Sequence, residues 1–372
     1  MSNKKNKNNP FNKIILILML LSSLFSGYLH TSIPVFFFAL IILGIYLFQI
    51  KFTVSQILAI CIFFIYLIVI LINSTEVLSS LSNLKWFYGI LVFLIILKAR
   101  DVKSYLFYCL SSHKLFLFFL FIIIFETILV NLFITPELVY GGAHKGSTIE
   151  ILSLSYNRPL GGLGNSSATS TFIIAWYYTI QKEIKKNKNF IFLFYSLLII
   201  LIMSGTGFIL YFIGLILNYL NNFRGNLRIK FSTLVLIMLI FPTFFYLISN
   251  SLNQKLSIDY YKNTIEYKFS LINRNEIFNN LDPLNYNFEN ILGYTVSSDV
   301  PLNAGDFGWL NLFYSQGILG FIIFFLIIFV FSNGLKKNRL AIIILFFGSF
   351  HYSAIFLAAG QILLSKSIMN DK

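Results

Sequence analysis

Long apolar runs separated by short polar segments make up most of the chain. The runs fall at about residues 14–29, 33–50, 54–72, 86–97, 115–134, 167–180, 190–203, 207–220, 231–249, 310–332 and 340–364. Runs that approach ~20 apolar residues are typical of helices that cross a bilayer, and a helix satisfies its own backbone groups there. The pattern predicts an all-α polytopic membrane protein with about eleven (ten to twelve) transmembrane helices. Residues 1–372 are expected to form a single integral membrane domain.

The composition agrees with this class of protein. Hydrophobic residues make up 57% of the chain and charged residues 11%. A water-soluble domain of this composition could not cover its surface with polar groups. The net charge of +14 does not indicate nucleic acid as a partner, because the basic residues sit in short clusters between apolar runs.

Those basic clusters predict the orientation of the chain. With the N-terminus inside, nineteen Lys and Arg residues fall in cytoplasmic segments and seven, including Lys85, in external ones. This bias follows the positive-inside rule. At the C-terminus, one helix over 340–364 gives about eleven spans and places Lys366 outside, whereas a split near Gly348 gives about twelve and places it inside. We favour the single helix, because the run is short for two crossings.

Two of the expected external segments are rich in candidate binding residues. The first is an Arg- and Gly-rich loop over about 135–166, and the second is a large loop over about 250–309. Within the large loop, apolar spacing over 260–281 predicts short amphipathic helices on the membrane surface. The loop is acidic and rich in tyrosine, which suits sugar binding, although a solvated connection fits the composition equally well.

Arg158 lies in a distinctive local sequence. It precedes Pro159 and the glycines at 161, 162 and 164, just before an apolar run. A glycine-rich turn that enters a helix exposes N–H groups and the positive end of the helix dipole. The planar guanidinium adds bidentate hydrogen bonding to phosphate oxygens. The pattern fits a pyrophosphate site, and it also fits a turn whose arginine reaches the membrane interface, which the local pattern alone slightly favours.

Other ionisable residues carry weaker signals. Glu126 falls inside the fifth apolar run, where a carboxylate is expensive, and we expect it to be protonated or paired across helices rather than catalytic. The chain contains no HExxH, CxxC or Walker-type phosphate motif. A metal site or a nucleotide-dependent reaction is therefore not expected.

Several short motifs follow one another in a characteristic order. These are RPLGGLGN from residue 158, SGTG from 204, Arg274 in the large loop, NILGY from 290, GDFGWL from 305 and QGILG from 316. The arrangement, over roughly residues 115–330, resembles the O-antigen and capsular polysaccharide polymerase family, and more distantly the O-antigen ligases. In the commoner family form an arginine follows the serine of the second motif, so we assign no phosphate role to Ser204–Gly207.

The resemblance implies a reaction and its partners. Such polymerases act at the external face of the bacterial cytoplasmic (inner) membrane, without metal or cofactor, in lipopolysaccharide or capsule synthesis. They transfer a growing glycan from undecaprenyl pyrophosphate to the non-reducing end of a new lipid-linked repeat unit. The expected partners are these lipid-linked oligosaccharides, membrane lipids and a chain-length regulator.

The resemblance also implies roles for individual residues. Arg158 and Arg274 are expected to stabilise the pyrophosphate leaving group, and Asp306 to accept the acceptor's proton. Independently of the resemblance, an aspartate at position 306 also fits a cap of the next helix. Further substrate contacts are expected from Gly161, Gly162, Asn165, His144 and Lys145. The ligases commonly carry a histidine where this chain has Asp306, which favours a polymerase.

Two alternatives remain open from the sequence. An O-antigen ligase would share most of the motifs. A flippase for lipid-linked oligosaccharides would share the hydrophobicity and the phosphate-binding arginines, but such transporters tend to show repeated halves and short loops. The chain shows no repeat, and its large loop has no counterpart in the first half.

Overall fold

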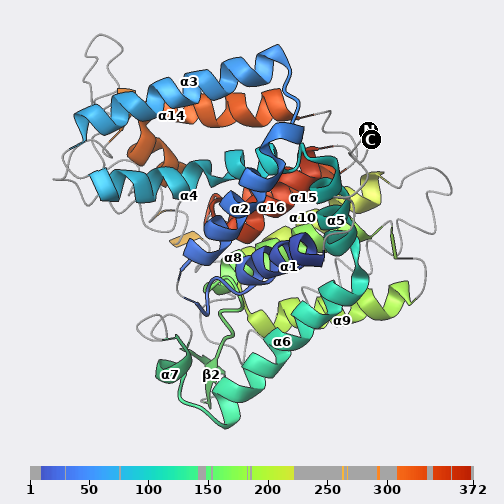
Figure 1. Cartoon of the computed structure of the whole chain (residues 1–372). Coiled ribbons are helices and arrows are strands. Elements are labelled where there is room, and N and C mark those ends of the chain that lie inside the picture. Colours follow the sequence, from blue (N-terminus) through green and yellow to red (C-terminus); the bar gives the residue numbers. More distant parts are fainter. Residues whose placement is uncertain are drawn as a thin grey trace.

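The computed structural model describes most of the chain and is mainly helical (Figure 1). The described residues are 10–29, 31–74, 77–140, 148–151, 154–181, 183–184, 187–221, 262–263, 266, 291–293, 308–332, 338–352 and 354–369. Arg274, Asp306, His144 and Lys145 lie outside these ranges, as do most residues of the large loop.

The first part of the chain forms helices joined by short turns. They are α1 (Pro10–Leu24), α2 (Ile33–Tyr46), the 3₁₀ turn η2 (Leu47–Gln49), α3 (Val54–Asn73), α4 (Val77–Ile96), α5 (Arg100–Ser111) and α6 (His113–Leu132). Helix α3 begins with a capping box: Thr53 Oγ1 accepts the Gln56 N–H at 3.4 Å, and Gln56 Oε1 accepts the Thr53 N–H at 3.2 Å. Such a pair satisfies two N–H groups that the first helical turn leaves open.

The remaining elements include a small hairpin. They are α7 (Pro136–Tyr140), β1 (Thr148–Ile151), β2 (Leu154–Asn157), α8 (Ser166–Ile180), α9 (Lys188–Ile202), α10 (Gly205–Asn221), α14 (Gly308–Phe331), α15 (Arg339–Gly348), the 3₁₀ turn η4 (Ala354–Phe356) and α16 (Ala358–Ile368). The antiparallel pair β1–β2 lies in the segment expected to be an external loop. The all-α prediction did not anticipate it, because two strands of four residues carry little hydrophobic pattern.

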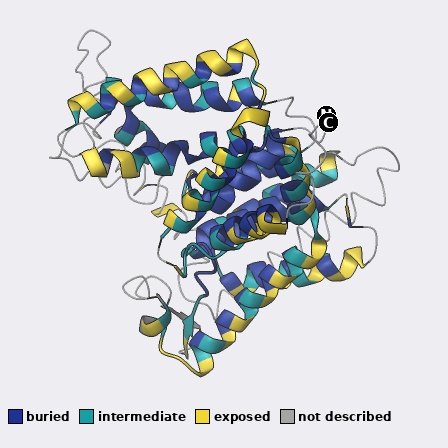
Figure 2. Ribbon diagram, viewed as in Figure 1, coloured by how far each residue is buried: buried dark blue, intermediate teal, exposed yellow. Residues whose placement is uncertain are grey.

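Helix α8 is the buried centre of the molecule. All of its residues are buried, and α10 and α15 pack against it (Figure 2). Trp176 of α8 contacts rings of α6 and donates its Nε1–H to the Leu110 carbonyl at 2.6 Å. Helix α3 instead exposes large apolar side chains, including Leu58 and Ile65. An apolar exterior around a packed interior is the arrangement that lipid requires.

Over the ranges that the structure describes, fewer helices are long enough for full membrane spans than the sequence predicted. Among the described residues, α3 and α6 are long and apolar enough to cross a membrane. A third span results if α4 and α5, which meet at 114°, are counted as one broken unit. Six further apolar helices in the described part of the chain have only 10–17 residues. The membrane-capable character is supported, whereas a count of about eleven full spans is not confirmed.

Helix α4 begins earlier than predicted. The sequence predicted a run from about 86, but the helix starts at Val77 and contains Lys85. The Lys85 side chain is half-buried in the helix, so it does not belong to an external loop. A lysine stem can lie along an apolar helix while its ammonium reaches a polar region, which is why one charge does not end the helix.

The predicted tenth span is broken at Gly317. This residue has φ 63° and ψ −174°, a conformation essentially restricted to glycine. Trp309 stacks on Phe325 with ring centroids 5.6 Å apart, and Phe313 meets Phe321 at 6.1 Å. A continuous helix would separate residues 309 and 325 by ~24 Å. The chain therefore folds back on itself at Gly317.

Two glycine motifs that are distant in sequence meet at this break. A Cβ atom on Gly317 would lie 2.5 Å from the Gly293 nitrogen and 2.4 Å from the Ile291 carbonyl oxygen. Gly293 has φ +79°, and a Cβ atom there would lie 2.4 Å from the Gly317 nitrogen. Residues 291–293 of the large loop are thus packed into the helical core, where Leu292 is buried.

The C-terminal run also breaks, so the expectation of one helix over 340–364 is wrong. Helix α15 ends at Gly348, whose carbonyl accepts the N–H groups of His351 at 3.1 Å and Tyr352 at 3.2 Å. These bonds close a turn, and the chain continues through η4 into α16. Lys366 Nζ then donates to Ser111 Oγ at 2.7 Å. Lys366 consequently lies beside segment 98–114, which the sequence places in the cytoplasm.

The contact between Lys366 and Ser111 predicts the side on which the C-terminus lies. Alkaline phosphatase fused after residue 372 should be inactive, because that enzyme needs an external location. A fluorescent protein fused at the same place should fluoresce. Fusions after residues 145 and 185 serve as the external and internal controls. An active phosphatase fusion at the C-terminus would favour the single-helix alternative.

The break at Gly317 predicts an asymmetry between two glycine substitutions. Gly317→Ala should lower the free energy of unfolding by about 1–3 kcal/mol, since alanine disfavours this backbone conformation and its methyl group overlaps Gly293. Gly44→Ala is the matched control, because nothing lies within 4 Å of a Cβ at that position of α2. Thermal unfolding in detergent measures both variants. Equal stability of the two would show that the break tolerates a side chain.

Candidate functional site

The site is built around a segment that follows strand β2 directly. We call residues 157–164 the arginine loop; it joins β2 to α8 and contains Arg158 next to the end of the strand. Strand β1 pairs with β2 in the register Thr148↔Asn157 to Ile151↔Leu154. Tyr156 of β2 donates its hydroxyl proton to the Leu201 carbonyl of α9 at 2.7 Å. The hairpin therefore ties the start of the arginine loop to the end of α9.

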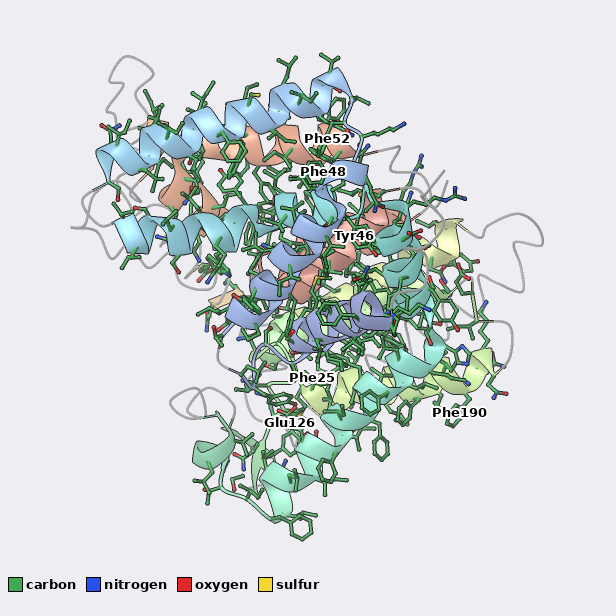
Figure 3. All side chains as sticks on the ribbon, viewed as in Figure 1. Phe25, Tyr46, Phe48, Phe52, Glu126 and Phe190 are labelled. Atoms are coloured by element: carbon green, nitrogen blue, oxygen red, sulfur yellow. The ribbon has the colours of Figure 1, made fainter. Side chains whose placement is uncertain are left out.

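Two polar side chains of α6 hold the arginine loop on both sides of Arg158. Before it, Asn131 donates to the Asn157 carbonyl and accepts the Asn157 N–H, both at 2.8 Å. After it, Glu126 Oε1 accepts the N–H groups of Leu160 at 2.9 Å and Gly161 at 3.0 Å. Figure 3 labels Glu126 on α6. The backbone on either side of Arg158 is thereby fixed to one helix.

The glycines bring the loop into close contact with the end of α1. The Gly27 N–H donates to the Gly162 carbonyl at 2.7 Å, and a Cβ on Gly162 would lie 2.0 Å from the Leu24 carbonyl oxygen. Gly161 and Gly164 have φ values of 72° and 74°, which glycine adopts without strain. The glycine-rich sequence is therefore explained by backbone packing against α1.

Asn165 caps helix α8. Its Oδ1 accepts the N–H groups of Ser167 at 2.8 Å and Ala168 at 3.1 Å. The N–H of Gly161 is likewise engaged within the protein, by Glu126. Gly161, Gly162 and Asn165 thus each make a hydrogen bond within the protein. Their contacts with a substrate remain predictions. His144 and Lys145 cannot be placed, because they lie outside the described residues.

Arg158 reaches the place where α9 ends and α10 begins. Its Nη1 donates to the Met203 carbonyl at 3.4 Å, and Met203 ends α9 in the left-handed conformation (φ 48°, ψ 43°). The next residue, Ser204, caps α10 by accepting the Gly207 N–H at 3.2 Å. Its hydroxyl also lies 2.9 Å from the Ser167 hydroxyl of α8. Helices α8 and α10 therefore begin side by side, next to Arg158.

This junction brings positive charges together, opposed by the C-terminus of α9 and by the carboxylate of Glu126. Two helix N-termini each carry roughly half a positive charge, and the guanidinium adds a full charge. The pKa of Tyr156 is raised to about 12, chiefly by burial; the positive charge of Arg158 lowers it and the negative charge of Glu126 raises it. Tyr156 thus stays protonated and keeps its bond to Leu201. Such an arrangement suits an anion with several oxygens, as a phosphate or pyrophosphate has.

Sequence reasoning found part of this site. Arg158 and its glycines were identified from their pattern, and Glu126 from its position inside an apolar run. Glu126 is paired with segments outside α6 rather than with another helix, since it also accepts a hydrogen bond from the Tyr28 hydroxyl of the turn after α1. Asn131 was missed, because one asparagine near the end of an apolar run carries no distinctive signal. Among the described residues, no group of three His, Cys, Asp or Glu side chains could hold a metal ion.

Comparison of the chain with models of known protein families, with curated proteins and with solved structures finds no match.

Proposed function

We propose that the protein is a polymerase of lipid-linked oligosaccharide repeat units. It transfers the growing glycan from undecaprenyl pyrophosphate to the non-reducing end of a new lipid-linked repeat unit, at the external face of the bacterial cytoplasmic membrane. The observation that carries the proposal is the position of Arg158 beside the starts of α8 and α10. The order of motifs along the chain supports the same family of reactions.

The chemistry requires charge neutralisation at the leaving group. The bond between the anomeric carbon and the pyrophosphate oxygen breaks, and negative charge grows on that oxygen. Arg158 stabilises it together with the N-terminus of α8, and Arg274 of the large loop is the second arginine in the proposal. Neither a nucleotide nor a metal is needed, because the donor is already activated.

The acceptor contributes a hydroxyl oxygen that forms the new glycosidic bond. Its proton passes to Asp306, the proposed base. Preorganised charge is more effective than charge that must be moved into place during the reaction. The bonds from Asn131 and Glu126 to the arginine loop supply that preorganisation for Arg158.

One feature of the fold favours a second candidate, a transporter of lipid-linked oligosaccharides. Transporters often contain discontinuous helices whose half-helix ends form the binding site near the middle of the membrane. Helix α14 is broken at Gly317, and α15 and α16 are separated by η4. Arg158, however, lies at the helix ends that follow the hairpin, so the proposed phosphate site is not at these breaks.

Three substitutions test the assigned roles. Arg158→Lys and Arg274→Lys should each reduce chain formation ~10²–10³-fold, because lysine keeps the charge but loses the bidentate fork. Asp306→Asn should abolish transfer and leave binding of the carrier lipid intact, because the amide still caps a helix but is not basic. The measurement is chain formation by purified protein from lipid-linked repeat units in excess EDTA.

Arg100→Lys is the matched control, because this exposed arginine begins α5 in a segment that the sequence places in the cytoplasm. It should leave chain formation unchanged. Normal chain formation by all three test variants, at unchanged protein level, would refute the assigned active site. Activity that returns only when Mg²⁺ or Mn²⁺ is supplied would refute the metal-independent reaction.

A further inference from the structure

Glu126 is a buried acid in the apolar helix α6. Only 5% of its surface is exposed, yet its hydrogen bonds reach three partners outside the helix. Thr127, the next residue, is 8% exposed and bonds only within α6, to the Ile123 carbonyl at 2.8 Å. The two neighbours differ in one respect: Glu126 connects α6 to other segments.

The bonds of Glu126 compensate for its burial. Burying a carboxylate costs several kcal/mol unless donors surround it. Oε1 accepts two backbone N–H groups of the arginine loop, and Oε2 accepts the Tyr28 hydroxyl. Both oxygens thus have donors, which makes Glu126 a poor base and a good anchor.

The anchored atoms lie immediately after Arg158. Leu160 and Gly161 follow Arg158 by two and three residues. Pro159, which lies between Arg158 and Leu160, has a fixed φ. On the other side, Asn131 holds Asn157. The backbone of Arg158 consequently has little freedom as long as Glu126 keeps its bonds.

We propose that Glu126 is a positioning residue that presents Arg158 to the anionic substrate. It joins α6, the arginine loop and the end of α1, and so fixes the guanidinium beside the starts of α8 and α10. The effect on substrate rests on the proposed function, whereas the effect on the loop does not.

Two substitutions at Glu126 separate the acceptor geometry from the charge. In Glu126→Gln the amide oxygen can still accept both N–H groups, and the amide nitrogen can donate to Tyr28. Glu126→Leu has no acceptor and leaves two buried N–H groups without their partner. Thr127→Val is the matched control, because its lost bond lies within α6. Tyr28→Phe removes the third bond and keeps the ring that packs near Phe25.

The first measurement is hydrogen exchange of the arginine loop in detergent or nanodiscs. Glu126→Leu should speed exchange of the Leu160 and Gly161 amides at least about tenfold, and Tyr28→Phe should speed it less. Glu126→Gln and Thr127→Val should stay close to the parent protein. Exchange in Tyr28→Phe and in folded Glu126→Leu that equals the parent would overturn the positioning role. If Glu126→Leu does not fold, unchanged exchange in Tyr28→Phe alone decides against it.

The second measurement is affinity for undecaprenyl pyrophosphate in detergent micelles. Glu126→Leu should weaken binding roughly tenfold, and Glu126→Gln should largely preserve it. Because Glu126 acts through Arg158, the double variant Glu126→Leu/Arg158→Ala should bind no more weakly than Arg158→Ala. Additive losses would overturn the inference.

The two measurements also separate this inference from the proposed function. If Arg158→Ala binds the lipid as well as the parent protein does, the proposed function fails. Faster exchange in Glu126→Leu would still establish the anchor in that case. If exchange is unchanged while Arg158→Ala loses binding, the inference fails and the proposed function stands.

Discussion

Buried backbone polar groups need partners from the protein, and this constraint applies where the described helices break. The arginine loop obtains its partners from Glu126 and Asn131 of α6. At the Gly317 break, the hydroxyls of Tyr66 and Tyr88 donate to the carbonyls of Gln316 at 2.9 Å and Gly320 at 2.6 Å. Polar side chains within apolar runs thus stabilise irregular backbone, and the site depends on one such case.

The same constraint connects the fold to the proposed chemistry. The break after α15 follows the pattern, because Gln361 of α16 donates to the carbonyl of Phe356 at 3.1 Å and to that of Trp86 at 2.7 Å. A helix break whose polar groups have partners in this way costs little free energy, and it leaves the two helix ends beside it in fixed positions. The backbone of Arg158 is held in the same way, since its loop is irregular but anchored on both sides. A guanidinium in a fixed position stabilises developing charge without reorganisation.

Hydrophobic runs predicted where most helices lie, because burial in lipid or core requires an apolar face in either case. The start predicted at about 167 is close to that of α8 at Ser166. The breaks were not predictable in the same way, because they depend on contacts between distant residues. Gly317 and Gly293 belong to motifs that the sequence shows separately, and only the fold brings them together. The β1–β2 hairpin and the early start of α4 at Val77 were not predictable either, because they depend on local packing.

The site was predictable in its residue types more than in its bonds. The arginine and glycines before α8 suggested an anion site, but the sequence cannot show that the Gly161 N–H bonds to Glu126. That bond requires α6 to lie beside the arginine loop, which is a tertiary fact. The roles assigned to Arg274 and Asp306 still rest on the order of the motifs, because both residues lie outside the described residues. Of the three proposed catalytic residues, Arg158 is therefore the one whose surroundings the structure describes.

The most direct measurement for the central claim is the set of lipid-linked intermediates in a strain that lacks this protein. If the protein is the polymerase, single repeat units should accumulate on undecaprenyl pyrophosphate at the external face. Complementation with the parent gene should restore long chains, and complementation with Arg158→Lys should not. Long chains that stay attached to the carrier would indicate a ligase, and single units held at the cytoplasmic face would indicate a flippase. Either result would contradict the account.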